Sequence, residues 1–414
     1  MKRTFLASLI VASTSTIAHD IGQDHEHVEG GWNAKAGFVS DIDVKARLWN
    51  PRGKSEQEIA ARAAYLDLMY NTPRSPEDEA KDIEFRKRFD DVVFVNAVLP
   101  AALGVKGFTK EHVVNGLQRN VDAGVDMINI STYNNPDSQL TNEADTFKQT
   151  SAAADEIGLK KAYTVKEIHE NHANGVTSYS LHTQGAEFAI ADMNSVGKYS
   201  TIGVNQMNFV YNADNALAGG GSKNDKGVTK LGKKFIEEAN KNGVLIDVSH
   251  SSSLTAIDAA KYSKKPVIAS HSNAYGLHPI GRNLTDEAIL AIGKNGGAVC
   301  STGVGMFLNA EGTASPEEFA EHVVYTAKLI GKDRTCFSTD FLHNYQDFLN
   351  ALLPATDAYP PELGMGAPTQ NTTIEQGWAV ARVLSEDHGW TDDEIRGFLG
   401  ENILRVYAAN WDNN

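Results

Sequence analysis

The chain has 414 residues, of which 41% are hydrophobic, and a formal net charge of −15. This length exceeds that of a usual single-core domain but lies within the range of α/β barrels that carry insertions. The negative charge argues against a nucleic-acid partner, because such partners are bound by basic groups that release counterions from the phosphates.

The first 18 residues have the pattern of a secretory signal peptide. Lys2 and Arg3 precede an apolar stretch, and Thr16 and Ala18 put small residues at the positions that a signal peptidase reads. The stretch is too short to cross a membrane, and no other run has the ~20 apolar residues that a span requires. We therefore expect an exported protein, periplasmic in a Gram-negative source, without a membrane span.

Two helices are expected before the repeating part of the chain. Ser55 opens a capping-box pattern at the start of a helix over 55–70, and Ser75-Pro76 begins a second helix over 75–89. Because both precede the repeating part, we expect them to pack on its outside.

Strand-like and helix-like segments alternate from residue 92 onward. The strand-like segments cover 92–99, 126–132, 176–184, 201–209, 244–250, 266–272, 297–304 and 335–341. Helix-like stretches between them include 110–123, 231–242, 253–262, 286–294 and 316–329. Eight strands alternating with helices is the count of a closed parallel barrel. A doubly wound open sheet is the alternative, which the lack of a glycine-rich phosphate fingerprint after the first strand disfavours.

The predicted fold is therefore an α/β (β/α)8 TIM barrel with an N-terminal helical extension. The expected division of the chain is a signal peptide over 1–18, a leader and helical extension over 19–90, and the barrel domain over 91–414.

The two cysteines, Cys300 and Cys336, fall on adjacent predicted strands. Neighbouring strands lie ~4.8 Å apart, so a disulfide is feasible if both side chains point the same way. The sequence leaves the pairing open, with two buried thiols as the slightly favoured alternative.

Polar side chains stand at the ends of three predicted strands. VLIDVSH closes on His250, PVIASHS carries His271, and TCFSTDF carries Asp340. The carboxyl ends of parallel strands meet at one rim of a barrel, where enzymes of this class keep their catalytic groups. Imidazole and carboxylate groups are ligands for zinc and related ions. The pattern therefore indicates a metal-assisted hydrolase.

The segments around these residues resemble the renal (membrane) dipeptidase family, a group of amidohydrolase-like metallopeptidases. The resemblance is carried by GVTKLGKKFIEEANKNGVLIDVSHSS, KPVIASHSNAYGLHPIGRNLTDE, STDF and TDDEIRGFLGENILRVY. It is strong over about residues 227–341 and from 390 onward, and weaker back to about residue 92. It implies an amidohydrolase-like barrel, zinc-dependent cleavage of dipeptides and, as in many relatives, pairing into a homodimer.

The resemblance also implies roles for single residues. His250 and His271 correspond to the two histidines that hold one of the family's two zinc ions. Arg282 corresponds to the arginine that anchors the substrate carboxylate, and Asp340 to the aspartate that transfers protons.

Three positions depart from the family pattern. The first strand reads Val95-Asn96-Ala97 where the family has the His-x-Asp pair that holds the other zinc ion. Gln184 stands where a glutamate bridges both ions, and Asn208 stands where a histidine stabilises the tetrahedral intermediate. One metal site is therefore expected to be missing, and Asn208 is the candidate for the lost histidine's role.

A single-ion site is the expected remainder. His250 and His271 with Asp340 as third ligand, and Gln184 as a weaker neutral one, would hold one divalent ion with an open position. Zinc is the expected metal, with iron or manganese as alternatives. If Asp340 becomes a full ligand, it can no longer act freely as a general acid. A metal-free pocket, with both histidines hydrogen-bonded, is the alternative.

Three functions remain open at this point. The first is an exported dipeptidase-like hydrolase that acts on a dipeptide or a small peptide-derived substrate. The second is a repurposed tailoring enzyme in the maturation of a peptide natural product such as a siderophore, where exported relatives of the family occur. The third is a non-catalytic binding protein.

Overall fold

The computed structural model describes residues 49–101, 103, 108–133, 143–356, 359, 361, 364 and 366–411. The predicted signal peptide and the leader before residue 49 lie outside these described residues.

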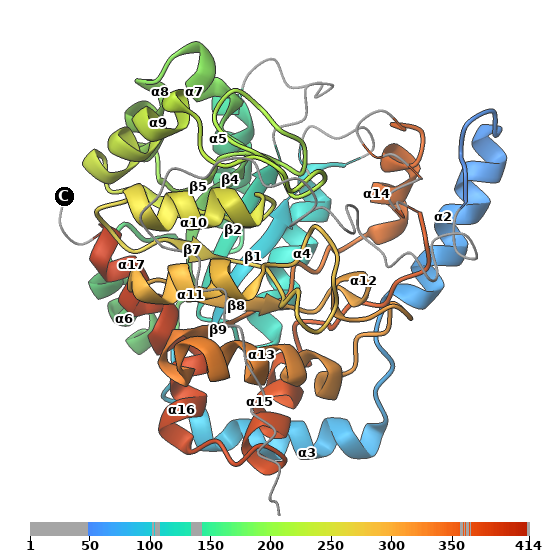
Figure 1. The fold of residues 1–414 in the computed structure, drawn as a ribbon. Coiled ribbons are helices and arrows are strands. Elements are labelled where there is room, and N and C mark those ends of the chain that lie inside the picture. Colours follow the sequence, from blue (N-terminus) through green and yellow to red (C-terminus); the bar gives the residue numbers. More distant parts are fainter. Residues whose placement is uncertain are drawn as a thin grey trace, which may run out of the picture.

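Parallel strands form one sheet in the order β1-β2-β4-β5-β6-β7-β8-β9, with the two-residue β3 added beside β4 (Figure 1). They are β1 (Val95–Ala101), β2 (Met127–Tyr133), β3 (Lys160–Lys161), β4 (Ser178–Gln184), β5 (Val204–Asn208), β6 (Leu245–Asp247), β7 (Ile268–Ala269), β8 (Ala298–Thr302) and β9 (Thr335–Ser338). Asn96 of β1 hydrogen-bonds to Thr339, directly after β9, so the two ends of this order meet. The nearly closed barrel confirms the predicted (β/α)8 fold and excludes the open doubly wound sheet.

Helices surround the strands (Figure 1). Between the strands lie α4 (Lys110–Asp122), α5 (Glu143–Glu156), α6 (Val165–Ala173), α7 (Glu187–Ala191), α8 (Ser195–Ser200), α9 (Lys230–Lys241), α10 (Ser253–Tyr262), α11 (Asp286–Lys294), α12 (Gly305–Leu308) and α13 (Pro316–Ile330). After β9 come α14 (Tyr345–Leu352), α15 (Gly377–Glu386), α16 (Asp392–Arg396) and α17 (Asn402–Trp411). The five helices predicted by range are all present, each within one residue of its expected bounds.

The N-terminal extension forms the two expected helices, α2 (Glu56–Tyr70) and α3 (Pro76–Arg86). The capping box at Ser55 fixes the start of α2. Buried leucines of α2 and α14 share one apolar cluster, which holds α2 beside the segment that follows β9. The end of α2 therefore reaches the barrel rim.

The opposite end of the barrel is closed by α17. Its Tyr407 and Trp411 are buried in one cluster with inward-facing apolar residues of the strands. The Trp411 indole donates a hydrogen bond to the backbone oxygen of Asn205 at 3.1 Å. Access to the barrel is thereby left to the rim at the carboxyl ends of the strands.

Cys300 of β8 and Cys336 of β9 form a disulfide. The two residues are paired in register across neighbouring parallel strands, so their side chains point to the same side of the sheet. The slightly favoured expectation of two free buried thiols is therefore wrong, because the register aligns both side chains and a sequence alone does not specify register.

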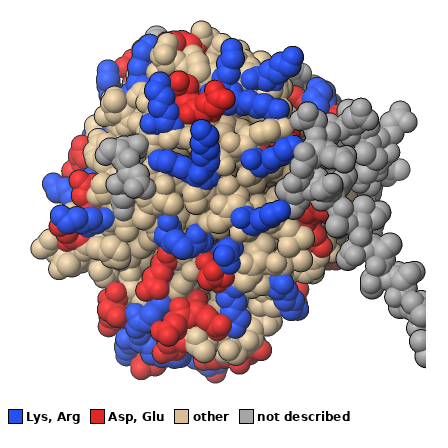
Figure 2. All heavy atoms as spheres, turned by 60° about the vertical axis from the view of Figure 1, so that its left-hand side comes forward, with Lys and Arg blue, Asp and Glu red and all other residues tan. Residues whose placement is uncertain are grey.

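Figure 2 shows acidic and basic side chains interspersed on one face of the molecule. Within the described part of the chain, no helix is both long and apolar enough to cross a membrane.

Candidate active site

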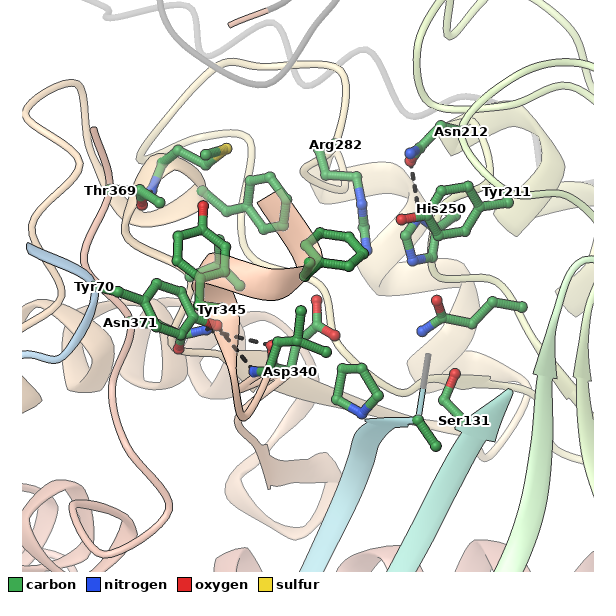
Figure 3. A pocket seen from close by; sticks show the side chains of 18 residues that line it. Tyr70, Ser131, Tyr211, Asn212, His250, Arg282, Asp340, Tyr345, Thr369 and Asn371 are labelled. Atoms are coloured by element: carbon green, nitrogen blue, oxygen red, sulfur yellow. Dashed lines mark hydrogen bonds between the residues drawn. The ribbon is translucent and has the colours of Figure 1, made fainter. Parts of the chain in front are cut away.

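A cleft opens at the carboxyl ends of the strands (Figure 3). Its polar lining includes four of the residues singled out from the sequence, namely Gln184, His250, Arg282 and Asp340. Much of the remaining wall is aromatic and comes from Tyr70, Tyr211, Phe307, Tyr345 and Phe348. The rim therefore combines a few polar groups with a large apolar wall, as small-molecule sites usually do.

His250 and His271 meet at this rim. Their Nε2 atoms lie 2.8 Å apart, and the two residues are 5% and 0% exposed. Burial, followed by the positive charge of Arg282, lowers the pKa of both imidazoles well below the ordinary 6.5. Both rings are therefore neutral at pH 7, so each carries one N–H and one lone pair.

The tautomer of His271 follows from a buried carboxylate beneath it. The Ser270 hydroxyl donates its only hydrogen to Asp247, and the same oxygen contacts His271 Nδ1 at 2.7 Å. His271 Nδ1 must therefore donate to Ser270, which leaves the lone pair on Nε2.

Asp247 is held in its ionised form by its surroundings. Burial alone would raise its pKa, but the hydrogen bond and charge of His182 outweigh burial, and the pKa is lowered. Its oxygens also accept from the backbone N–H groups of Ser249 and Ser270 and from the Gln206 amide. A carboxylate in this network can only accept, so the direction of the Ser270 hydrogen bond is fixed.

The tautomer of His250 follows from Asn212. His250 Nδ1 lies 2.7 Å from Asn212 Oδ1, an acceptor, so Nδ1 carries the hydrogen and Nε2 carries the lone pair. Both histidines thus turn lone pairs toward each other across 2.8 Å. Two facing lone pairs repel unless a cation lies against them, so this donor set fits one metal ion. If the Asn212 amide were turned over, His250 Nε2 could instead donate to His271, which describes a metal-free pair.

The third ligand expected from the sequence is not brought to the pair. In the described residues, no three His, Cys, Asp or Glu side chains lie close enough together to hold one ion. Asp340 therefore does not complete the predicted ligand set with His250 and His271. Gln184 does approach the pair, with its amide nitrogen 3.5 Å from His271 Nε2.

Asp340 lies across the cleft, two residues after the end of β9. Burial raises the pKa of its carboxyl group to about 7, and the charges of Arg282 and His182 oppose that rise only in part. Its backbone has φ 51°, in the left-handed region that costs a non-glycine residue about 1–3 kcal/mol. His250 has the same feature, with φ 66°. Strain of this kind is typical of functional sites.

Arg282 is buried, and some of its N–H donors have no partner among the described residues. Its Nη2 reaches only the backbone oxygen of His271 at 3.4 Å, and its Nε and Nη1 atoms have no partner among the described residues. The guanidinium stacks over the Phe307 ring at 5.1 Å. A buried guanidinium with unpaired N–H groups has the donor geometry to accept a carboxylate as partner.

The asparagine side chains at the positions that differ from the family pattern are hydrogen-bonded within the protein. Asn208 is fully buried and is absent from the cleft lining; its amide is bound to His182 and to the backbone oxygen of Ser249. The catalytic role of Asn208 stays a prediction, since the structure places this residue in a buried hydrogen-bond network and not in the cleft lining. Asn96 likewise hydrogen-bonds to Asn120 and Thr339.

Sequence reasoning missed the supporting residues of the site. Asp247, Ser270 and Asn212 fix the imidazoles, and Tyr70 enters the cleft wall from the N-terminal extension. A signal was available only for Asp247, which is an acid inside the apolar run VLIDV.

The sequence matches the family described as membrane dipeptidase, peptidase family M19, over residues 103–352. It is also 26% identical, over 241 residues, to a protein of Schizosaccharomyces pombe described as uncharacterized dipeptidase C965.12. That alignment covers 56% of this chain and 53% of the relative, so the chain spans about half of the relative's length.

Solved structures share the fold. An amidohydrolase from Pseudomonas aeruginosa superposes with a TM-score of 0.70 at 21% identity, over 80% of this chain and 99% of that one. The probable dipeptidase PvdM from the same organism gives 0.61 at 17%, over 82% and 100%. A metallopeptidase from Rhodobacter sphaeroides, solved with a phosphinate mimic of L-Ala-D-Ala, gives 0.58 at 19%, over 77% and 99%. Identities this low carry the fold alone.

Proposed function

The protein belongs to the membrane dipeptidase family, peptidase family M19, whose profile matches more than half of the chain, and we propose that it is an exported hydrolase of dipeptides or small peptide-derived substrates that works with one metal ion. The observation that carries this proposal is the approach of the His250 and His271 Nε2 atoms to 2.8 Å, with each Nδ1 held by a hydrogen-bonding partner, Asn212 or Ser270. A neutral pair so arranged has a cation as its natural partner.

The second ion of the family does not fit this chain. The first strand offers Asn96, whose amide is already hydrogen-bonded on both sides, and the bridging position offers the neutral Gln184. Neither side chain brings negative charge to a second cation. The proposed site is therefore mononuclear, with His250 and His271 as ligands and zinc as the expected ion.

The charges of the cleft favour a substrate that carries a carboxylate. Arg282 is buried and forms no ion pair within the described residues, both imidazoles are neutral, and the pKa of Asp340 is raised to about 7. The cleft is thus short of negative charge, and a terminal carboxylate on Arg282 would supply it.

A division of labour for hydrolysis follows. The ion, when bound, supplies Lewis-acid activation of water and of the scissile carbonyl. Asp340, with a pKa of about 7, takes the proton from the attacking water and returns it to the nitrogen of the leaving amine. Water and the peptide bond are consumed, and a carboxylate and an amine are released.

The test is metal content together with turnover. Protein purified without chelators is expected to carry about one divalent ion per chain, and His250→Ala to carry none. Dipeptides should be cleaved, and their C-terminal amides cleaved poorly, because the amides lack the carboxylate for Arg282. His172→Ala, which changes a histidine that pairs with Asp126 far from the cleft, is the matched control. No bound metal and no turnover with added zinc, manganese or iron would refute the proposal.

Export is part of this proposal. The signal-peptide pattern in residues 1–18 supports it, and so does the Cys300–Cys336 disulfide, since such bonds persist in oxidising compartments. Expressed in a bacterial host, the protein should be recovered outside the cytoplasm, cut after Ala18 and without free thiols. Retention of the uncut chain in the cytoplasm would contradict this part.

A repurposed tailoring enzyme or a non-catalytic binder for a peptide natural product such as a siderophore is the second candidate. The specific observation in its favour is that no third charged ligand lies at the histidine pair in the described residues. It requires the turned Asn212 amide and a His250 Nε2–H. Imidazole ¹⁵N NMR of metal-free protein separates the two states. Ligand-induced stabilisation without turnover, or an accumulated peptide precursor on gene deletion, would favour this second candidate.

A further inference from the structure

Tyr70 brings an unused hydrogen-bond donor into the cleft. It is the last residue of α2, in the N-terminal extension, and lies outside the region 103–352 that the family profile matches. Its ring lines the cleft together with Asp340 and Arg282 (Figure 3). The side chain is 5% exposed, so its hydroxyl group has to find its partners inside the protein or in a ligand.

Packing holds the Tyr70 ring in place. Tyr345 stacks on it with ring centres 3.7 Å apart and planes 12° apart, and Phe341 lies 5.0 Å away. The backbone of Tyr70 also accepts a hydrogen bond from Asn371 N at 2.6 Å. The hydroxyl is therefore presented at a fixed point of the cleft wall.

Both acceptor positions of the Tyr70 hydroxyl are filled. It accepts from Leu342 N at 2.9 Å and from Asn371 Nδ2 at 3.0 Å. The Asn371 amide cannot be turned over, because the same Nδ2 also donates to the backbone oxygen of Asp340 at 3.3 Å. Each of the two contacts thus brings a hydrogen to Tyr70, and the hydrogen of the phenol itself is left over.

Within the described residues, that phenol hydrogen has no acceptor. In this part of the chain, the Tyr70 hydroxyl forms hydrogen bonds only with Leu342 N and Asn371 Nδ2, and none with the Asp340 carboxylate. Since the residue lines the cleft, an acceptor for this hydrogen can be supplied by a bound ligand.

We propose that Tyr70 is a substrate-binding residue, whose hydroxyl donates a hydrogen bond to an oxygen of the bound peptide-like substrate beside Asp340. This inference rests on the proposed function. Tyr70 gives the cleft a hydrogen-bond donor that β5 does not supply, because the Asn208 amide already donates to the backbone oxygen of Ser249. The donor comes instead from a helix that precedes the barrel, so substrate choice would depend on the N-terminal extension.

The test compares binding and turnover in Tyr70→Phe and wild-type protein, both loaded with zinc. The probe is a phosphinate mimic of a dipeptide, whose charged oxygens are strong acceptors, and its affinity is measured by calorimetry. We expect Tyr70→Phe to bind it about 10- to 100-fold more weakly, the range for a lost hydrogen bond to a charged group. A comparable loss is expected in kcat/KM for a cleaved dipeptide.

Two variants separate contact with substrate from a structural role. Asn371→Ala removes one hydrogen bond that Tyr70 accepts but keeps the phenol hydrogen, so it should weaken probe binding less than Tyr70→Phe does. Tyr179→Phe removes another buried hydroxyl, bound to Asp155 on the outside of the barrel, and should leave probe affinity unchanged. The acidic limb of the pH–rate profile should stay in place in Tyr70→Phe, since the hydroxyl does not act through Asp340.

The outcomes are distinguishable. Equal probe affinity in wild type and Tyr70→Phe overturns this inference and leaves the proposed function intact. An equal loss in Asn371→Ala, or a shifted acidic limb, also overturns it, because either result assigns Tyr70 a positioning role. If wild-type protein binds no phosphinate and cleaves no dipeptide, the proposed function and this inference fall together.

Discussion

The two sides of the barrel rim differ in what their strand ends carry. The side formed by β6, β7 and β9 presents ionisable groups, His250, His271 and Asp340, and leaves lone pairs or protons available. The side formed by β1, β4 and β5 presents amides, and Asn96 and Asn208 are bound into buried networks. The amides of Asn96 and Asn208 find their partners within the protein, whereas the facing Nε2 atoms of the histidine pair leave a place for a ligand.

The largest expected effect is on the ionisable side. His271→Ala removes one of the two imidazole ligands, so zinc affinity should fall beyond detection and dipeptide hydrolysis by about 1,000-fold or more. Metal analysis after dialysis and initial rates provide the measurements. Unchanged zinc content would show that the ion is held elsewhere.

Asp340, which follows β9, should make the stability of the protein depend on pH. The folded pKa of Asp340 is about 7 and the ordinary value is 3.8, so the folded state holds a proton that the unfolded state releases between these values. The stabilisation is fully present below about pH 4 and is lost as pH rises through 7, by at most about 4 kcal/mol. Denaturant unfolding of metal-free wild type against Asp340→Asn should show this decline in the wild type alone. Parallel curves would contradict the raised pKa.

Asp247 connects the ionisable side to the barrel interior. Asp247→Asn replaces a carboxylate that can only accept with an amide that can also donate. The Ser270 hydroxyl can then donate to His271 Nδ1, and His271 can change tautomer. Zinc affinity should fall by about 10- to 100-fold, the usual cost of losing such a supporting group. Chelator competition gives the affinity, and ¹⁵N shifts of the imidazole report the tautomer. A weaker affinity with an unchanged tautomer would point to general destabilisation.

Gln184 offers a position on the amide side of the rim where a neutral side chain can be replaced by a charged one. Its amide nitrogen already lies 3.5 Å from His271 Nε2, and Gln184→Glu would add a carboxylate there. Zinc affinity should rise by about 10-fold, because the neutral histidine pair gains an anionic partner. A decrease would indicate that the cleft has no room for a third ligand.

The smallest effect on the site is expected at Asn96. Asn96→Ala leaves Asn120 and the Thr339 N–H without their partner, so the protein should lose about 1–3 kcal/mol of stability. Zinc affinity should not change, since this amide is proposed to hold no ion. Loss of zinc from this variant at a temperature where it remains folded would break the contrast between the two sides.

The alternation of strands and helices could be predicted because each element has its own local cause. Apolar runs bounded by Gly or Pro make buried parallel strands, and caps such as Ser55 and Pro76 fix helix starts. β4 ends at Gln184 as expected, whereas β6 ends at Asp247 and β7 at Ala269, so His250 and His271 stand in the loops directly after their strands. Arg282 and Asp340 reached the cleft as expected, although Asp340 does not join the histidines as a ligand.

The sequence by itself thus determined the barrel, the rim on which the polar groups stand and the family. Tertiary structure decided the disulfide, the burial of Asn208, the tautomers set by Asp247 and Asn212, and the arrival of Tyr70 from a helix before the barrel. The physical reason is that periodicity and capping are local and readable along the chain, whereas register, hydrogen-bond direction and side-chain convergence depend on residues far apart in sequence.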